Sequence, residues 1–586
     1  MYKADTEIFN KSLEFIPIFR GKELKKQYFS KNKSIYLIFL CMAIVYISGP
    51  LHSGVILVGS DRIFHLYRME EVYLSLKAGH WVPWISTHMI TSVGQATNMY
   101  YPWGNIVPYA LIRIVIKKPI LAFYLYMLLM QFLGLSFAYY SARKIGSQQR
   151  HAFIFAILLR FSAYIMHNDF ARVDIGEAWA LIFVPLVFAG LVLITLKSQY
   201  LEGMFLLSFG LAGILYSHLL TTLLTVFVLC LVYLLTWNAQ QHKKVILGYI
   251  SLSAIVFLVL TAAFLVPFII STLQNKTILP PAGDLSNYKL SFDQLVSWSL
   301  GNSLQMNQPN IGIWLILTAF FGIIGFKRNS IFMKGTYLCG ILLLVMSSNL
   351  FPWRLFRNTP VKMIQFPWRL LSMSIIFLAY FSAKKIVELD RIEVVFVTLL
   401  VLIISIGAFQ QYRSTQDDRW AASTSQMTIH PWGYLFNDKN YKLGVSRSQY
   451  TDYLPASAKS SEKDTFKKYA FIDDKKVKLR TDQIKSSYQS QTFHLQLQAD
   501  QQKIVLPFYI YHVPDYQLSV NGKKEKVMVN ANALPVVHAH HRRNLKITIK
   551  FVTPKSYVLA QFVSIIGGIT VLCYYSLQRY GLRKKM

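Results

Sequence analysis

The sequence contains few cysteines and few acidic residues. Four of its 586 residues are cysteine and 28 are aspartate or glutamate, against 61 lysines and arginines. All four cysteines lie within apolar runs, as small buried residues do, so the sequence predicts neither a disulfide framework nor a metal site. Charged residues make up 15% of the chain, below the roughly 25% of a soluble domain, and hydrophobic residues make up 54%. These proportions indicate a polytopic membrane protein.

Signatures of several enzyme classes are also missing. The chain has no P-loop, no glycine-rich dinucleotide-binding motif and no nucleophile elbow. This disfavours a nucleotide-driven transporter, and we expect no bound cofactor. The net charge of +33 would suggest nucleic-acid binding in a soluble protein. Because cytoplasmic loops of membrane proteins collect lysine and arginine, we predict no nucleic-acid partner here.

Apolar runs along the chain predict about twelve membrane spans, because a span needs about 20 mostly apolar residues. The runs cover residues 35–50, 119–141, 151–167, 178–196, 201–217, 218–237, 244–270, 311–326, 334–349, 366–383, 392–409 and 556–577. Basic residues gather in the tails 1–34 and 578–586 and in every second short loop. We therefore expect both termini to be cytoplasmic, with an even number of spans.

This topology divides the chain into a helical membrane domain, residues 35–409, and an external polar segment, residues 410–555, before the last span. The polar segment contains strand-like stretches at 492–498, 503–511, 516–520, 526–530 and 545–552. Asn521-Gly522 follows the third stretch and is typical of a hairpin turn. We expect a small antiparallel β domain outside the membrane. The segment carries 23 basic against 12 acidic residues, an excess that the positive-inside trend does not explain.

The first external loop, residues 51–118, contains a predicted helix. Its apolar residues recur at helical spacing: Leu66, Met69, Val72, Tyr73 and Leu76. Such an amphipathic helix lies either on the membrane surface or against other parts of the protein. Asp61 stands at its start, with His65 and Arg68 on the same face. Asp61 is either a helix cap or a general base, and Arg68 would then be its anion-binding neighbour.

A second group of polar residues joins the predicted spans 151–167 and 178–196. Asp169, Arg172, Asp174 and Glu177 could form part of a polar site, or the acids could simply be partners of a helix dipole. Arg160 lies near the middle of its span, where a charge usually faces a partner or a cavity.

Two further sequence features lie near predicted outer span ends. His218 is more typical of a hydrogen-bonded structural residue than of a catalyst.

The sequence Phe-Pro-Trp-Arg-Leu occurs at residues 351–355 and again at 366–370. Four cations belong to this region, namely Arg354, Arg357, Lys362 and Arg369. Arginine binds phosphate through paired donors and tryptophan favours the interface, so the region either binds a lipid phosphate or is an ordinary aromatic and basic belt.

These features together resemble the GT-C superfamily of membrane glycosyltransferases. Within it, the chain is similar to the bacterial YfhO-like proteins and the "6-pyruvoyl-tetrahydropterin synthase-related" membrane family. The resemblance rests on Gly59-Ser60-Asp61 with His65, Tyr100-Tyr101-Pro102-Trp103, Arg172-Val173-Asp174-Ile175-Gly176-Glu177, Gln365-Phe366-Pro367-Trp368-Arg369, Tyr453-Leu454-Pro455 and Leu506-Pro507-Phe508-Tyr509. It covers nearly the whole chain through short motifs.

The resemblance implies a bacterial plasma-membrane enzyme that transfers a sugar from a polyprenyl-phosphate lipid to an acceptor on the outer face. An anionic envelope polymer is the expected acceptor. Asp61 would be the base, His65 would shape its site, and the four cations would bind the donor phosphate. Many relatives carry two acids in the first loop. Glu70 and Glu71 are poor second acids, so metal dependence stays open.

Two other functions fit parts of the sequence. A polysaccharide polymerase or ligase would use a lipid-linked oligosaccharide and a large late loop instead of an acid after the first span. A lipid or polymer transporter would show matching halves with broken helices, and we find neither in the sequence. The pterin-synthase part of the family name implies no chemistry here, because the sequence has no metal-binding histidine cluster.

Overall fold

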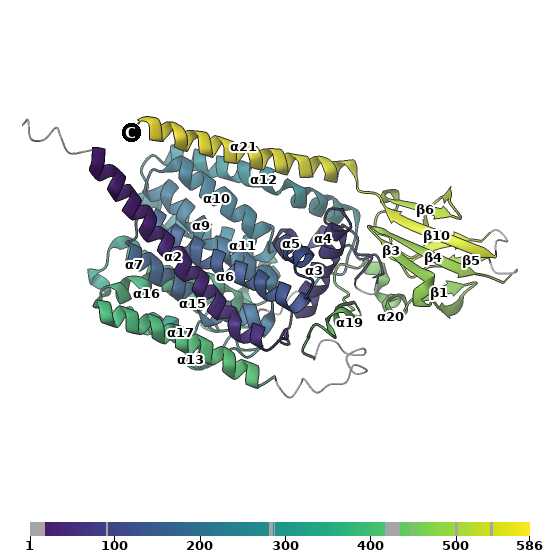
Figure 1. Cartoon of the computed structure of the whole chain (residues 1–586), viewed down its shortest axis with the longest axis horizontal. Coiled ribbons are helices and arrows are strands. Elements are labelled where there is room, and N and C mark those ends of the chain that lie inside the picture. Colours follow the sequence, from purple (N-terminus) through teal and green to yellow (C-terminus); the bar gives the residue numbers. More distant parts are fainter. Residues whose placement is uncertain are drawn as a thin grey trace, which may run out of the picture.

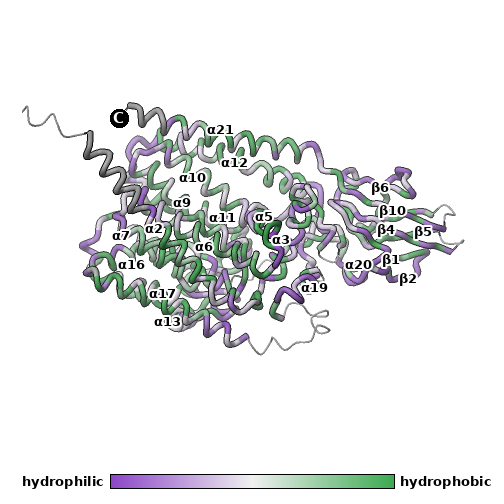
Figure 2. The backbone as a smooth tube through the Cα atoms, in the orientation of Figure 1, coloured by the Kyte–Doolittle hydropathy of each residue, from purple (hydrophilic) through white to green (hydrophobic). Residues whose placement is uncertain are grey.

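The computed structural model describes residues 18–89, 92–280, 285, 287–416, 434–446, 449–498, 502–539 and 543–585. Helices fill one end of the molecule and β-strands the other (Figure 1). Apolar residues dominate the long helices, whereas hydrophilic and apolar residues are mixed along the strands (Figure 2). The first turn of α2 and the last turn of α21 both lie at the end of the helical domain that faces away from the strands.

Seven of the described helices are long and apolar enough to cross a membrane. These segments are Lys33–His52 in α2 (Ile18–His52), Pro119–Lys144 (α6), Ile175–Leu196 (α9), Lys243–Gln274 (α12), Pro367–Val387 (η8, Pro367–Leu370, with α16, Leu371–Val387), Ile392–Ser414 in α17 (Arg391–Ser414) and Lys555–Gln578 in α21 (Lys555–Lys585). Shorter apolar helices are Gly104–Val115 (η2, Gly104–Ile106, with α5, Val107–Val115), α10 (Tyr200–Leu215), α11 (Leu219–Leu235) and α15 (Ile331–Met346). The predicted multi-pass membrane architecture is confirmed.

Two predicted spans differ from single long helices. The span 151–167 is broken: α7 (Gln149–Arg160) ends before α8 (Ala163–Met166), and the π-helix η3 (His167–Arg172) follows. In the span 311–326, the helix α14 (Ile313–Phe321) has nine residues, which at 1.5 Å per residue is about half the thickness of a bilayer core. The count of twelve spans therefore stays a prediction.

The predicted first external loop, residues 51–118, is folded into the protein. Its helix α3 (Arg62–Lys77) has almost every side chain buried, so it packs against protein and does not lie on the membrane surface. Glu70 accepts a hydrogen bond from the Tyr109 hydroxyl at 2.8 Å, and Glu71 accepts one from the backbone N–H of Met89 at 2.7 Å. Both acids of this helix therefore hold the loop together.

The predicted external segment forms a β domain, which contains two antiparallel five-stranded sheets in its described part. One has the order β2-β1-β5-β9-β8 and the other β3-β4-β10-β6-β7. The strands are β1 (Tyr469–Ile472), β2 (Lys475–Lys478), β3 (Ile484–Ser487), β4 (Ser490–Gln496), β5 (Lys503–Val505), β6 (Tyr516–Val520), β7 (Lys523–Glu525), β8 (Met528–Val529), β9 (Pro535–His538) and β10 (Asn544–Phe551). The predicted turn Asn521-Gly522 joins β6 and β7 with positive φ at both residues.

The prediction of five strands was incomplete. The strands β1, β2 and β3 lie before residue 490, where no strand was predicted, and β7 and β9 were also missed. The β domain contacts the first external loop: the Trp84 N–H donates to Gln489 Oε1 at 2.6 Å, and the Tyr509 N–H donates to the Val93 carbonyl at 2.8 Å. The loop therefore connects the β domain to the helical domain.

Short helices complete the described structure. They are α4 (Thr97–Tyr100), η4 (Trp237–Ala239), α13 (Phe292–Leu300), η5 (Phe326–Arg328), η6 (Trp353–Phe356), η7 (Pro360–Ile364), α19 (Tyr441–Ser446), η11 (Ala456–Ser460), α20 (Glu462–Phe466), η12 (Thr481–Gln483) and η13 (Val513–Asp515).

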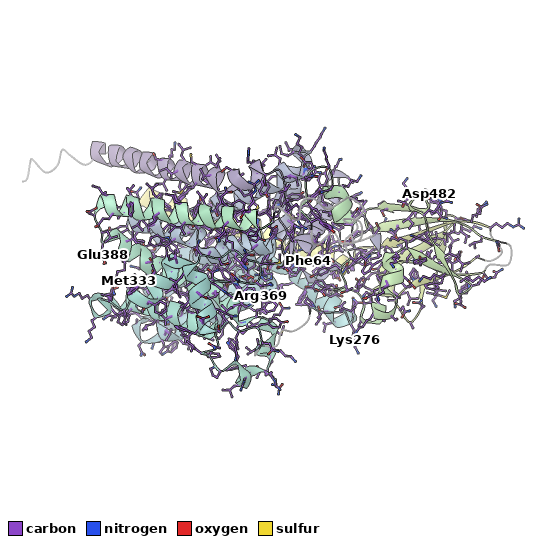
Figure 3. All side chains as sticks on the ribbon, turned by 90° about the horizontal axis from the view of Figure 1, so that it is seen from below. Phe64, Lys276, Met333, Arg369, Glu388 and Asp482 are labelled. Carbon is purple, nitrogen blue, oxygen red and sulfur yellow. The ribbon has the colours of Figure 1, made fainter. Side chains whose placement is uncertain are left out.

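The predicted topology can be tested by cysteine labelling. Ser460 is exposed near the β domain, and Glu388 is exposed just after α16, at the opposite end of the molecule (Figure 3). Because the basic short loops are expected inside the cell, an impermeant maleimide should label Ser460→Cys in intact cells and Glu388→Cys only after permeabilisation. The unmodified protein controls for the native cysteines. The reverse pattern would invert the topology.

Candidate active site

Several chain segments that are distant in sequence meet beside the start of α9. The start of α3, the π-helix η3, the start of α11 and the segment before α16 all reach this region. Figure 3 shows Arg369 and Phe64 in the middle of the molecule, between the cytoplasm-predicted end marked by Glu388 and the β domain marked by Asp482. Asp61 of the first loop therefore lies beside Asp174 and Glu177.

The backbone here allows unusually close packing. Val173 adopts φ 55°, a left-handed conformation that is rare for a β-branched residue, and it separates Arg172 from Asp174. A Cβ on Gly59 would lie 2.6 Å from the Arg172 carbonyl oxygen, so only glycine fits there. The Asp61 N–H donates to that same carbonyl at 2.9 Å. The start of α3 is thereby fixed to the η3 turn.

Arg172 is the centre of the charge cluster. Its Nη2 lies 3.2 Å from Asp61 Oδ2 and 2.6 Å from Asp174 Oδ2, and its Nη1 lies 3.1 Å from Glu177 Oε2. Nη1 also donates to Asn168 Oδ1 at 2.8 Å. One planar guanidinium thus orients three carboxylates from two segments.

Asp174 combines the two roles that the sequence left open. It accepts the Glu177 N–H at 3.1 Å as the cap of α9, and its Oδ1 lies 3.3 Å from His65 Nε2. Burial raises the pKa of Asp174, but the charge of Arg172 and the His65 hydrogen bond outweigh it and bring the pKa well below its usual range. Asp174 is therefore ionised, and His65 contacts it instead of Asp61.

Asp61 differs from the other acids in its exposure. Its side chain is 36% exposed, against 5% for Asp174 and 2% for Glu177. Asp61 is the first residue before α3, yet its side chain makes no capping hydrogen bond, so the capping role is wrong. Burial and the charges of Asp452 and Asp61 raise the pKa of Tyr450, whose ring also lies 4.8 Å from that of Phe64. Asp61 thus has an aromatic neighbour from the external segment.

The second Phe-Pro-Trp-Arg copy belongs to this cluster. Arg369 is buried, with Nε 3.8 Å from Glu177 Oε2 and Nη1 donating to Gln365 Oε1 at 2.6 Å. Trp368 is stacked 5.0 Å below the guanidinium of Arg172. The sequence did not single out Tyr164, whose hydroxyl donates to Glu177 Oε1 at 2.6 Å. The sequence feature that could have indicated Tyr164 is its position one helical turn before His167, at the end of a predicted span.

The first copy is arranged differently. Trp353 is buried and donates to the Met346 carbonyl, while Arg354, Arg357 and Lys362 are exposed. The two copies are therefore not equivalent, because only the second one brings its arginine into the charge cluster.

Arg68 and His218 have structural contacts. Arg68 is fully buried and donates to the Pro102 carbonyl at 2.5 Å, with its guanidinium 4.4 Å from the Tyr101 ring centroid. It fixes the Tyr101-Pro102 turn, so the expected role as an anion-binding neighbour of Asp61 is wrong. His218 caps α11 through Thr221, as a hydrogen-bonded structural residue would. Burial lowers the pKa of His218 to about 4, which keeps the ring neutral.

Arg160 and Asp169 form a second buried cluster. Arg160 Nη2 lies 3.6 Å from Asp169 Oδ2, and Arg160 Nε donates to Gln131 Oε1 at 2.8 Å. Tyr46 donates to the same Asp169 oxygen at 2.6 Å. The expectation that Arg160 faces a partner is confirmed, and the pair connects α7, η3 and α2 within the membrane domain.

Acidic residues here are paired with arginines. Among the residues that the structure describes, no group of three or more His, Cys, Asp or Glu side chains has the arrangement of a metal site. The cluster is suited to hold one accessible carboxylate beside fixed cations, which is an arrangement for proton transfer next to an anionic group.

Residues 99–414 match the family model described as "6-pyruvoyl-tetrahydropterin synthase related domain; membrane protein". The chain belongs to this family. The matched segment runs from α4 through α17 and includes Arg172, Asp174, Glu177 and Arg369, whereas Asp61 precedes it. The family predicted from the motifs is confirmed. Both this family and the seven long apolar helices described above identify the chain as a membrane protein.

A protein of Lactococcus lactis subsp. cremoris, described as uncharacterized, is 25% identical over 356 residues. The match covers 57% of this chain and 56% of that protein, so the chain spans just over half the length of this relative. Among solved structures, the arabinofuranosyltransferase AftD from mycobacteria aligns at 15% identity with a TM-score of 0.39, over 64% of this chain and 26% of AftD. The Archaeoglobus fulgidus oligosaccharyltransferase aligns at 13% identity with a TM-score of 0.36, over 69% of this chain and 60% of that one.

Proposed function

We propose that the chain is a GT-C-type glycosyltransferase that moves a sugar from a polyprenyl-phosphate donor to an acceptor outside the membrane, such as an anionic envelope polymer. The observation that carries the proposal is the single accessible carboxylate, Asp61, at the edge of a buried cluster of fixed charges. Asp61 comes directly after the first long apolar helix, as the resemblance to GT-C enzymes leads one to expect.

In the proposed reaction, the Asp61 carboxylate removes the proton of an acceptor hydroxyl. The acceptor oxygen then bonds to the anomeric carbon, while the bond from that carbon to the phosphate oxygen breaks and polyprenyl phosphate departs. Direct displacement of this kind inverts the anomeric centre. Arg172 orients Asp61 at 3.2 Å, and it is held in turn by Asp174 and Glu177. A rigidly oriented base loses little entropy when it reacts.

The departing phosphate needs cationic neighbours. Arg369 is the strongest candidate, because it belongs to the same cluster as Asp61 through Glu177 and its buried Nε makes no hydrogen bond among the described residues. The exposed Arg357 and Lys362 precede it in the same loop and would assist. Arg354 occupies the same place in the first copy of the motif as Arg369 in the second, but it lies outside the cluster and therefore serves as a control.

We expect Arg369→Ala to lower donor affinity by about 10- to 150-fold, the scale of one charge-assisted hydrogen bond. Arg369→Lys should lie between the wild type and the alanine variant, because lysine keeps the charge but loses the paired donors. Binding of a labelled polyprenyl-phosphate sugar to purified protein measures this, with Arg354→Ala as the matched control. Equal affinities in all four proteins would leave Arg369 as an ordinary belt residue.

The function as a whole is tested by comparing membrane lipids and wall polymers from cells with and without the protein by mass spectrometry. A missing glycosyl substituent on a polymer, with its polyprenyl-phosphate sugar accumulating, is the expected result. Accumulation of an unpolymerised lipid-linked oligosaccharide would instead favour a polymerase or ligase. Unchanged glycosylation together with altered lipid distribution would favour a transporter.

A further inference from the structure

The helical domain contains a hollow at the end opposite the candidate active site. The site lies at the beginnings of α9, α11 and α16, whereas the hollow lies between the far ends of the same helices. Along α9 the wall of the hollow runs from Pro185 to Leu196, which at 1.5 Å per residue lies about 15–32 Å beyond Ile175 at the candidate site. Figure 3 shows Met333, which lines the hollow, at the far end from the β domain.

The hollow has an apolar chamber and a polar mouth. The apolar chamber measures about 390 Å³ and is bounded by α6, α9, α11, α15 and α16, with Phe188, Cys339 and Ile376 among its walls. The mouth measures about 380 Å³ and carries Lys197 and Lys384. Both include Tyr380 and Phe332 in their lining, so the two spaces adjoin.

Polar contacts connect residues in the wall of the mouth. Ser147 Oγ lies 2.7 Å from the Tyr380 hydroxyl, and His151 Nε2 lies 2.9 Å from the Tyr380 carbonyl oxygen. Lys197 is exposed, with Nζ 3.8 Å from the place of a Cβ on Gly146 in the turn after α6. Lys384 is half exposed and lies 3.9 Å from Glu388, an ion pair open to solvent.

One residue in the wall of the apolar chamber has a buried hydroxyl. Ser141 lines the chamber, and the Ser141 hydroxyl has no hydrogen-bond partner among the residues that the structure describes. Gly335 also faces open space, because a Cβ placed there would meet no atom within 4 Å.

We propose that this hollow binds one anionic phospholipid of the leaflet at that end of the helices, with an acyl chain in the apolar chamber and its phosphate beside Lys197 and Lys384. A hydrocarbon chain matches the apolar walls, and a phosphate matches two lysines at the helix ends. Basic pockets between transmembrane helices on the cytoplasmic side are suited to anionic headgroups, which are abundant there. This site is separate from the proposed transferase site and does not depend on it.

Two glycines allow a matched test of the apolar chamber. Gly335→Leu in α15 should place a side chain in the chamber, because a Cβ there meets no atom within 4 Å, and leucine also favours a helix over glycine. Gly248→Leu in α12 is the control, because a Cβ there also meets open space but the residue lies outside the hollow. Native mass spectrometry of protein in mild detergent with added phosphatidylglycerol should show one bound lipid in the wild type and in Gly248→Leu, and a loss of about fivefold or more in Gly335→Leu.

The mouth is tested by replacing both Lys197 and Lys384 with glutamine, which leaves helix packing untouched. The wild type should prefer phosphatidylglycerol by about tenfold over phosphatidylcholine, whose positive choline group offsets its phosphate charge, and the double variant should lose that preference. Equal retention in Gly335→Leu and Gly248→Leu, or no preference in the wild type, would overturn the proposal. So would preferential retention of polyprenyl phosphate over phosphatidylglycerol.

Discussion

Replacing Asp61 with asparagine should reduce turnover by about 100-fold or more, the usual effect of losing a general base. Asparagine has the same shape and its amide oxygen can still accept the hydrogen bond from Arg172, which lies 3.2 Å from the carboxylate. The change therefore removes basicity and little else. Transfer of labelled sugar from a polyprenyl-phosphate donor by purified protein measures turnover, and donor binding should stay within about twofold of the wild type.

A second variant separates catalysis from folding. Asp482→Asn removes a carboxylate from the exposed surface of the β domain, where its partner Arg480 is also exposed. Surface substitutions of this kind change little, so its turnover should match the wild type. Thermal unfolding of both variants should coincide with that of the unmodified protein. Near-normal turnover in a folded Asp61→Asn protein would contradict the role of base.

The membrane class of the fold could be predicted from the sequence, because long apolar runs have one physical explanation. The packing of helix α3 could not be predicted in this way. Its apolar spacing is the same for a helix on a membrane and a helix on protein, and the partners that decide between them, such as Tyr109 and the backbone near Met89, are distant in sequence. The edge strands β2 and β7 are only four and three residues long and largely exposed, so they lack the alternation of buried and exposed residues that reveals a strand.

The residues of the candidate site were largely predictable, but their grouping was not. Asp61, Arg172 and Arg369 stood out as charges near span ends, yet periodicity cannot bring three separate segments together. The two Phe-Pro-Trp-Arg copies looked equivalent, and their different burial follows from tertiary packing alone. Arg68 was misread because a buried arginine bonded to carbonyl oxygens has the same sequence signal as an anion binder.

Arg172→Met should be the most destabilising of the substitutions considered. It keeps most of the side-chain volume but leaves Asp174 and Glu177 buried beside each other without their main cation. Removing one partner of a buried ion pair costs about 3–5 kcal/mol, a large part of the roughly 5–15 kcal/mol that stabilises a typical domain. Thermal unfolding, monitored by fluorescence-detected size-exclusion chromatography, should show a strongly lowered midpoint for Arg172→Met. The midpoint of Arg172→Lys should be intermediate, because lysine keeps the charge.

The pH dependence of that loss distinguishes charge from packing. In the wild type the pKa of Asp174 is held well below its usual range. The ionised Asp174 therefore adds to the free energy of unfolding above the unfolded-state pKa of about 4. This stabilisation is lost as the pH falls toward the lower folded-state pKa. In Arg172→Met, burial without the guanidinium raises the carboxyl pKa, so protonation relieves the penalty as pH falls. The difference between the thermal unfolding midpoints of the two proteins should therefore become smaller as the pH is lowered from about 7 to about 5. A difference that stays constant over this range would mean that Arg172 stabilises the protein through packing, and that Asp61 is oriented by other groups.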